Sequence, residues 1–331
     1  MDKRAFLEGF FTASTVAFGG LYMLQRMQRP SLLLTTPAAT VAAPIAASTP
    51  VPPGFQFTAI EIASAKPAQG LPLPAPELSA NSDFSVASLS DAEVESYLRK
   101  IRNFDAVFTS DIYLDARYES TLLQTTQRMS RVEAYMGHGN FNLMSFDEML
   151  SSGRNFPKIG AFTPAELEFL EEIFFANPNR YGFFGKKISP QITAAIPKLD
   201  VAKIRDSGHF LLKGESLNLY QQINRDVGNE IVLTSGVRSI VKQMHLFLGK
   251  SIEANGNLSR ASRSLAPPGH SYHGAGDFDI GKLGLGARNF TADFSATEEY
   301  KKIAGLGYVD IRYPTDNLFG VRFEPWHIKL G

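Results

Sequence analysis

The chain contains no cysteine. This absence excludes disulfides, thiolate nucleophiles and thiolate-bound zinc, and it is compatible with an oxidising compartment. The 33 basic residues balance the 33 acidic ones, so a formal net charge of zero gives no electrostatic reason to expect a nucleic acid partner. The His-Glu-x-x-His, Gly-x-Ser-x-Gly and phosphate-loop patterns are also missing, which removes the sequence support for the enzyme classes that they mark.

An apolar run covers residues 5–24 and is broken only by Glu8. Its 20 residues, at a helical rise of about 1.5 Å each, would span a bilayer core of roughly 30 Å. Residues 1–29 therefore predict export, with this segment serving as an uncleaved anchor or as a cleaved signal peptide. Because no convincing small-x-small cleavage site follows the run, we expect the uncleaved anchor.

Two regions of different texture follow the apolar run. Residues 30–89 are rich in Pro, Ala, Ser and Thr and carry few charges, so they predict a linker that cannot bury enough apolar surface to fold. Residues 90–194 begin with the helix-start pattern Ser-Asp-Ala-Glu, and helical periodicity recurs at 118–136 and 163–175. We expect a mainly helical accessory region there.

Residues 195–331 combine segments of helical periodicity with segments of strand periodicity. Segments 216–226 and 239–254 have helical patterns. Short apolar segments predict strands at 230–234, 278–280, 308–311 and 320–323. The expected fold class is α+β, with a small antiparallel sheet and flanking helices in this C-terminal domain.

The residues that can carry chemistry are concentrated in segments 267–281 and 324–331, which hold three of the six histidines. Zinc hydrolases need two or three neutral imidazoles, often with a carboxylate, and a coordination position left open for water. Three residues of these segments can supply such ligands: His273, Asp279 and His327. Glu324 precedes the last of them by three residues, and on a strand or tight turn both side chains would reach one cavity.

Three motifs resemble those of VanY-type D-alanyl-D-alanine carboxypeptidases. They are Ser-Gly-Val-Arg-Ser at 235–239, Ser-x-His-x-x-Gly at 271–276 and Glu-Pro-Trp-His at 324–327. This family belongs to the zinc superfamily that also contains lysostaphin-type endopeptidases and the hedgehog signalling domain. Each motif alone is weakly specific, but together they stand in the family's order within residues 195–331.

The resemblance implies a role for each matching position. The implied zinc (Zn2+) ligands are His273, Asp279 and His327. Glu324 would be the general base that activates the water, and Arg238 would polarise the scissile carbonyl and stabilise the oxyanion.

Two further positions are implied as substrate-binding residues. Ser271 matches a serine near the substrate carboxylate, and Gln243 matches a glutamine that follows the arginine motif.

One spacing departs from the family pattern. Six residues usually separate the first histidine from the aspartate, whereas His273 and Asp279 enclose five. His270 and Asp277 do enclose six, so a shifted register is an alternative. We favour the former pair because the flanking serine and glycine then fall on family positions. Strand alternation places both aspartates on one face, so periodicity does not choose between them.

Rival interpretations exist in the same region. Ser239 and Lys242 match the Ser-x-x-Lys motif of penicillin-binding proteins, but the Lys-Thr-Gly motif of those enzymes is missing. A cell-wall-binding module that kept the metal and lost turnover is a second alternative. The remaining histidines have no such neighbours in sequence and are expected to be structural: His138, His209 and His245.

The resemblance and the N-terminal run together imply an exported zinc peptidase that acts on the peptidoglycan stem peptide. The expected reaction is D-alanyl-D-alanine carboxypeptidase cleavage, with a D,D-endopeptidase that cuts cross-links as the alternative. The expected location is the periplasmic side of a bacterial inner membrane, reached through the N-terminal segment, with secretion after signal cleavage as the alternative.

Overall fold

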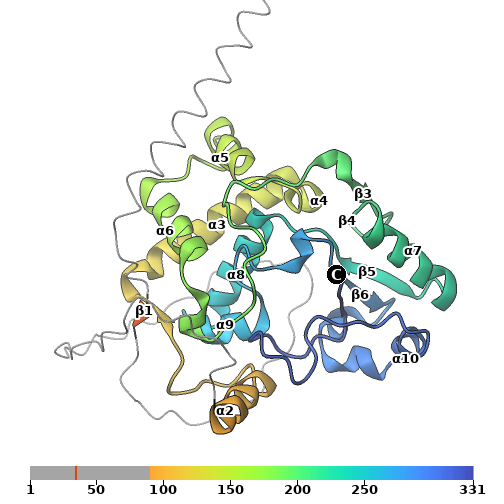
Figure 1. Ribbon diagram of the computed structural model, residues 1–331. Coiled ribbons are helices and arrows are strands. Elements are labelled where there is room, and N and C mark those ends of the chain that lie inside the picture. The colour runs from red at the N-terminus through yellow and green to blue at the C-terminus, as the bar shows by residue number, and fades with distance from the viewer. Residues whose placement is uncertain (1–33, 36–89, 331) are drawn as a thin grey trace, which may run out of the picture. The chain divides into compact units, whose positions relative to one another are not determined.

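The computed structural model describes residues 34–35 and 90–330 (Figure 1). The expected anchor at 1–29 lies outside the described residues, and so does the expected linker at 30–89 apart from its residues 34–35. Among the described helices, none combines the length and the apolar character that crossing a membrane requires.

The region 90–194 is mainly helical, as predicted. Its α-helices are α2 (Asp91–Arg102), α3 (Glu119–Met136), α4 (His138–Phe141), α5 (Phe146–Asn155) and α6 (Pro164–Phe175). Its short elements are β2 (Tyr113–Leu114), which pairs with β1 (Leu34–Thr35), and the 3-10 turns η2 (Ala116–Tyr118) and η3 (Pro178–Tyr181). Helix α2 begins after Ser90, whose backbone N–H donates to Glu93 Oε2 over 2.8 Å, and α6 begins after Thr163 with the same capping box.

The C-terminal part of the chain is α+β, as the sequence predicts. Its α-helices are α7 (Glu215–Val227), α8 (Ile240–Glu253), α9 (Leu258–Ser264) and α10 (Glu298–Gly305). Its strands are β3 (Val201–Lys203), β4 (Phe210–Leu212), β5 (Ile231–Ser235), β6 (Phe278–Lys282) and β7 (His327–Ile328). Short 3-10 turns complete it: η4 (Lys198–Asp200), η5 (Tyr272–Gly274), η6 (Gly286–Phe290) and η7 (Ala292–Ala296).

The main sheet is antiparallel with the strand order β5-β6-β7, and β3 pairs separately with β4. In the register, Asp279 of β6 lies opposite Ser235 on one neighbour and His327 on the other. Gly236 follows β5 directly, and a Cβ atom there would overlap the carbonyl oxygen of Phe210. Only glycine therefore lets β4 approach the end of β5, where the first motif lies.

The core of the C-terminal domain lies between this sheet and its helices. Its buried members are Leu211, Ile223, Ile231, Leu233, Phe278, Ile280, Phe294, Ile303, Trp326 and Ile328. The single tryptophan is 3% exposed and packs edge-on against Phe290. Burial of this apolar face fixes β6 and β7, and with them the polar residues on the same strands.

Two predicted strands are wrong. At 308–311 only Ile311 forms an isolated bridge, to Ile328, before the chain bends. At 320–323 the Arg322 N–H donates to the carbonyl of Arg263 at the end of α9, over 2.8 Å, so no strand partner is present there. Both segments alternate like strands in sequence, but a strand needs a continuous ladder with a neighbouring strand, and the contact of 308–311 with β7 stops at this single bridge.

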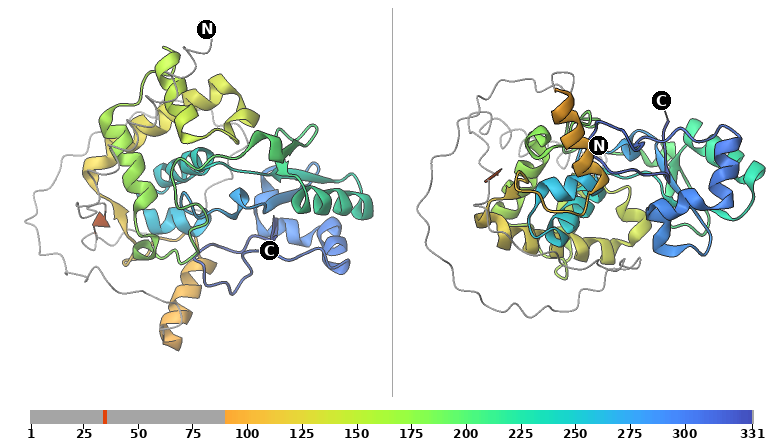
Figure 2. Two further views of the ribbon diagram at one scale, coloured as in Figure 1. Left: turned by 45° about the horizontal axis from the view of Figure 1, so that its top comes forward. Right: turned by 90° about the horizontal axis from the view of Figure 1, so that it is seen from below.

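Polar contacts join the helical region to the C-terminal domain. Lys242 Nζ donates to Glu133 Oε1 over 2.8 Å, which links α8 to α3, and the Ser239 N–H donates to the Asn142 carbonyl over 2.8 Å. In both views of Figure 2 the cyan helices α8 and α9 lie against the yellow and green helices of residues 90–194. The helix that follows the first motif is therefore packed on the accessory region.

Candidate metal centre

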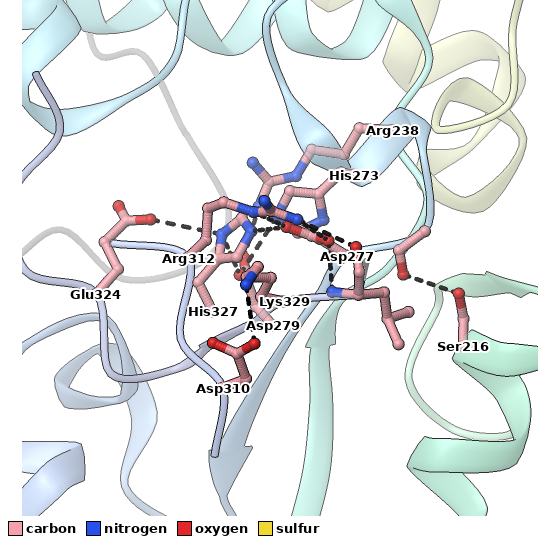
Figure 3. Close-up of polar contacts among 12 residues, drawn as sticks. Ser216, Arg238, His273, Asp277, Asp279, Asp310, Arg312, Glu324, His327 and Lys329 are labelled. Carbon is pink, nitrogen blue, oxygen red and sulfur yellow. Dashed lines mark hydrogen bonds and ion pairs between the residues drawn. The ribbon is translucent and has the colours of Figure 1, made fainter. Parts of the chain in front are cut away.

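The sheet brings one histidine and one aspartate of the predicted ligand set together, and η5 adds the second histidine. Their candidate ligand atoms all lie within 4.8 Å of one another: His273 Nε2, Asp279 Oδ1 and His327 Nδ1. The aspartate oxygen is 3.3 Å from each of the two ring nitrogens (Figure 3). The three residues are 1%, 2% and 4% exposed in the same order.

The second nitrogen of each ring is already engaged. His273 Nδ1 donates to the Gly236 carbonyl over 2.7 Å, so its Nε2 faces the cluster. His327 Nε2 donates to Asp277 Oδ2 over 2.9 Å, so its Nδ1 faces the cluster. Both His273 Nε2 and Asp279 Oδ1 are buried without a hydrogen-bond partner among the described residues. Two imidazoles and a carboxylate whose donor atoms converge, two of them without a hydrogen-bond partner, fit a metal ion, which would leave a further coordination position open.

The surroundings hold His273 and Asp279 in the protonation states that bind a metal. Burial, helped by the charge of Arg238, lowers the pKa of His273 to about 4, so the ring is neutral at physiological pH. Burial alone would raise the pKa of Asp279, but the neighbouring His273 and Arg238 hold it well below its usual range. A neutral imidazole and an ionised carboxylate are the forms that bind a metal.

His327 predicts a pH dependence of metal binding. Burial alone would lower its pKa, but the hydrogen bonds to Asp277 and Glu324 raise it from 6.5 to about 9. At neutral pH a metal ion must displace this proton, so the association constant of a divalent metal should rise roughly tenfold per pH unit between 7 and 9 and level off above. Competition titrations with a chromophoric chelator across this range measure it.

The same shift has a consequence for the stability of the metal-free protein. Because the folded pKa of His327 lies above the unfolded one, its contribution is present below pH 6.5 and is lost as the pH rises through about 9. For the metal titration, an association constant that did not change with pH would contradict the assignment of His327 as a ligand that must lose a proton.

Glu324 and Arg238 lie at the edge of the cluster. Glu324 is 8% exposed, and its Oε2 is 3.5 Å from His327 Nδ1. A tight turn holds the pair, because the His327 N–H donates to the Glu324 carbonyl over 3.1 Å. Arg238 Nη2 donates to Asp279 Oδ2 over 2.6 Å, and its Nε donates to Ser235 Oγ over 2.8 Å. A carboxylate and a guanidinium thus flank the three donors.

Ser271 and Gln243 line a small pocket beside Arg238. The Gln243 Nε2 donates to the Ala266 carbonyl over 2.6 Å, and its Oε1 is buried without a hydrogen-bond partner among the described residues. Ser189 and Ala195 also line this pocket. Ser271 and Gln243 therefore share a pocket with Arg238, which in turn contacts the donor Asp279.

The fold does not bring His270 and Asp277, the ligand pair of the shifted register, into one site. His270 points elsewhere, with Nδ1 bonded to the Gly185 carbonyl at 3.0 Å. Asp277 lies behind His327 and pairs with Arg312, whose Nε donates to Asp277 Oδ2 over 2.9 Å. Sequence reasoning missed Arg312, because it follows the predicted strand at 308–311 and belongs to none of the three motifs.

The Ser-x-x-Lys match has a structural role. Ser239 Oγ accepts from the Lys242 N–H over 3.2 Å as the N-cap of α8, and Lys242 Nζ is bonded to Glu133. The full-length chain should therefore not be labelled covalently by a fluorescent penicillin. Ser239→Ala should lower the free energy of unfolding by about 1 kcal/mol, as loss of an N-cap does. Penicillin labelling that disappeared in this variant would restore the rival class.

The other three histidines lie together at the junction of α3, α4 and α8. His138 Nδ1 bonds Glu133 Oε1 at 2.8 Å, His245 Nδ1 lies 3.0 Å from Glu133 Oε2, and His209 Nδ1 bonds the Asn142 amide at 3.3 Å. Among the described residues they do not join a group of three metal-type donors, and their structural role stays a prediction.

The fold and the site together define the class of this domain. This is an α+β domain with a His-Asp-His candidate metal site at its antiparallel sheet. Residues 213–330 match the family model of VanY, D-alanyl-D-alanine carboxypeptidase. The resemblance found in the motifs is thereby confirmed.

Several solved structures are similar to this chain. The LdcB LD-carboxypeptidase is 22% identical over 40% of this chain and 68% of its own, with a TM-score of 0.34. VanYB in complex with D-alanine-D-alanine is 24% identical over 40% and 78%, with a TM-score of 0.32. The D,D-dipeptidase VanXYg with a D-Ala-D-Ala phosphinate analogue is 29% identical over 36% and 49%, with a TM-score of 0.30. A comparison with curated protein sequences gives no match.

Proposed function

We propose that this protein is a zinc-dependent peptidoglycan peptidase that hydrolyses the D-alanyl-D-alanine bond of the stem peptide as a carboxypeptidase. The observation that carries the proposal is the convergence of three buried donor atoms, on His273, Asp279 and His327, whose geometry is set by other hydrogen bonds. The family match of residues 213–330 supports the substrate class.

The residues around the donors have separate roles in the proposed reaction. His273, Asp279 and His327 would hold zinc, which when bound lowers the pKa of a coordinated water to about 7. Glu324 takes the proton of the attacking water and later gives it to the leaving amine. Arg238, held by Asp279 and Ser235, presents its guanidinium to the oxygen that becomes negative in the transition state.

Substrate contacts and location belong to the same proposal. Ser271 and Gln243 would bind the end of the substrate in the pocket beside Arg238. The apolar run at residues 5–24 supports a place on the periplasmic side of a bacterial inner membrane. Full-length mass in membrane fractions is the expected result, and a shorter soluble form would show signal cleavage instead.

The test uses the full-length chain in detergent, assayed for zinc content and for D-alanine release from a muramyl pentapeptide. Stoichiometric zinc with chelator-sensitive, penicillin-insensitive release is the expected result. Zinc without D-alanine release would overturn the carboxypeptidase assignment, and cleavage of cross-linked muropeptides would then identify an endopeptidase. Binding of muropeptides without any cleavage would identify a binding module, and absence of zinc would refute the metal site.

A further inference from the structure

The carboxylate of Asp277 supports His327 from the side opposite the donor cluster (Figure 3). Asp277 is 1% exposed and accepts four hydrogen bonds. Its Oδ2 accepts from His327 Nε2 and from Arg312 Nε, each over 2.9 Å. Its Oδ1 accepts from Arg312 Nη2 over 3.0 Å and from the Leu330 N–H over 2.9 Å. The carboxylate therefore has one orientation that satisfies all its partners.

Arg312 is fixed from several sides as well. Its side chain is 7% exposed, and its guanidinium lies over the Tyr272 ring, 3.8 Å from the ring centroid. Nη2 also donates to the Leu330 carbonyl over 3.1 Å. A bidentate guanidinium on a carboxylate is a rigid arrangement, because both planes are held by two parallel hydrogen bonds.

The direction of the His327 ring follows from this arrangement. Once Nε2 donates to a fixed carboxylate, Nδ1 must face the opposite side, where the oxygen Asp279 Oδ1 lies 3.3 Å away. A histidine that binds a metal generally donates its second nitrogen to such a partner, which fixes its orientation and tautomer. Asp277 supplies this partner here, although its spacing in sequence also suits a ligand.

We propose that Arg312 and Asp277 are positioning residues for the metal ligand His327. Asp277 accepts the Nε2 hydrogen and turns Nδ1 toward the donor cluster, and Arg312 fixes the plane of Asp277. The inference rests on the proposed metal site and is independent of the substrate. It assigns a role to a residue outside the three motifs, in the segment that leads from α10 to β7.

The chain contains a matched pair for comparison. Arg263 and Asp111 form a second buried bidentate pair, with side chains 6% and 1% exposed and nitrogen–oxygen distances of 2.8 and 3.1 Å. Besides the arginine, Asp111 accepts from the Asn257 amide over 2.8 Å. Asp277 accepts from the His327 ring at the equivalent place in its own pair. A variant of Asp111 therefore reports the cost of disturbing such a pair without touching a metal ligand.

The experiment compares Asp277→Asn with Asp111→Asn in the full-length protein. Zinc dissociation constants are measured by competition with a chromophoric chelator, and melting temperatures are measured after chelator treatment. Asp277→Asn should raise the zinc dissociation constant by about 10- to 100-fold, the range found for such supporting partners. Asp111→Asn should lower the melting temperature and leave the zinc dissociation constant near the wild-type value.

Arg312→Lys is the second variant, because it keeps the positive charge and loses the bidentate geometry. It should weaken zinc binding by less than Asp277→Asn does. If Asp277→Asn does not fold, the zinc affinity of Arg312→Lys alone tests the positioning role. The Co2+ absorption spectrum should also change in the variants at 277 and 312, since the orientation of one ligand changes. Equal zinc affinity and unchanged spectra in these variants would overturn the positioning role. A wild-type chain that bound no zinc would overturn the metal site itself.

Discussion

Replacement of Glu324 by alanine should leave the zinc content unchanged and lower D-alanine release by about 10²- to 10⁴-fold, the usual contribution of a general base. Its carboxylate is 3.5 Å from His327 Nδ1, yet it is not one of the three converging donors. The site should therefore keep its metal and lose the group that takes the proton. Elemental analysis and initial rates on a muramyl pentapeptide measure the two effects separately.

Glu299→Ala is the control for this variant. The Glu299 carboxylate on α10 pairs with Lys282 on β6 at 2.8 Å. It is not one of the donors that converge among the described residues. Its removal should leave both zinc content and rate near the wild-type values. Near wild-type turnover in Glu324→Ala would show that another group acts as the base.

Replacement of His327 by alanine should remove both the zinc and the hydrolysis. The change deletes one of three donors and leaves Asp277 and Arg312 buried without the ring that they orient. Zinc content should fall from stoichiometric to background, and D-alanine release should fall to the level of the chelator-treated wild-type chain. The loss of rate should exceed that of Glu324→Ala, because the metal and the water it activates are lost together.

His270→Ala is the matched control. His270 is also buried, and it lies three residues before His273, but it bonds Gly185 away from the cluster. This variant should lose thermal stability and keep its zinc. Loss of zinc from His270→Ala together with full zinc in His273→Ala would instead support the shifted ligand register.

Much of the fold could be predicted because its signals are local. The capping boxes at Ser90 and Thr163 mark helix starts, and the segment at 239–254 becomes α8. The segments at 308–311 and 320–323 failed because a strand is defined by its neighbour, which a local pattern does not contain. The same limit hid Arg312, whose partner Asp277 lies 35 residues away in the chain.

The sequence by itself determined which residues are available for a metal site and the order in which they occur. Motif spacing brought His273, Asp279 and His327 into one hypothesis, although spacing alone left Asp277 as an alternative ligand. Only the tertiary structure decided which ring nitrogens face inward, because the carbonyl of Gly236 and the carboxylate of Asp277 engage the others. Those partners come from separate segments that the sheet and its core hold together, and their hydrogen bonds give each donor atom its direction.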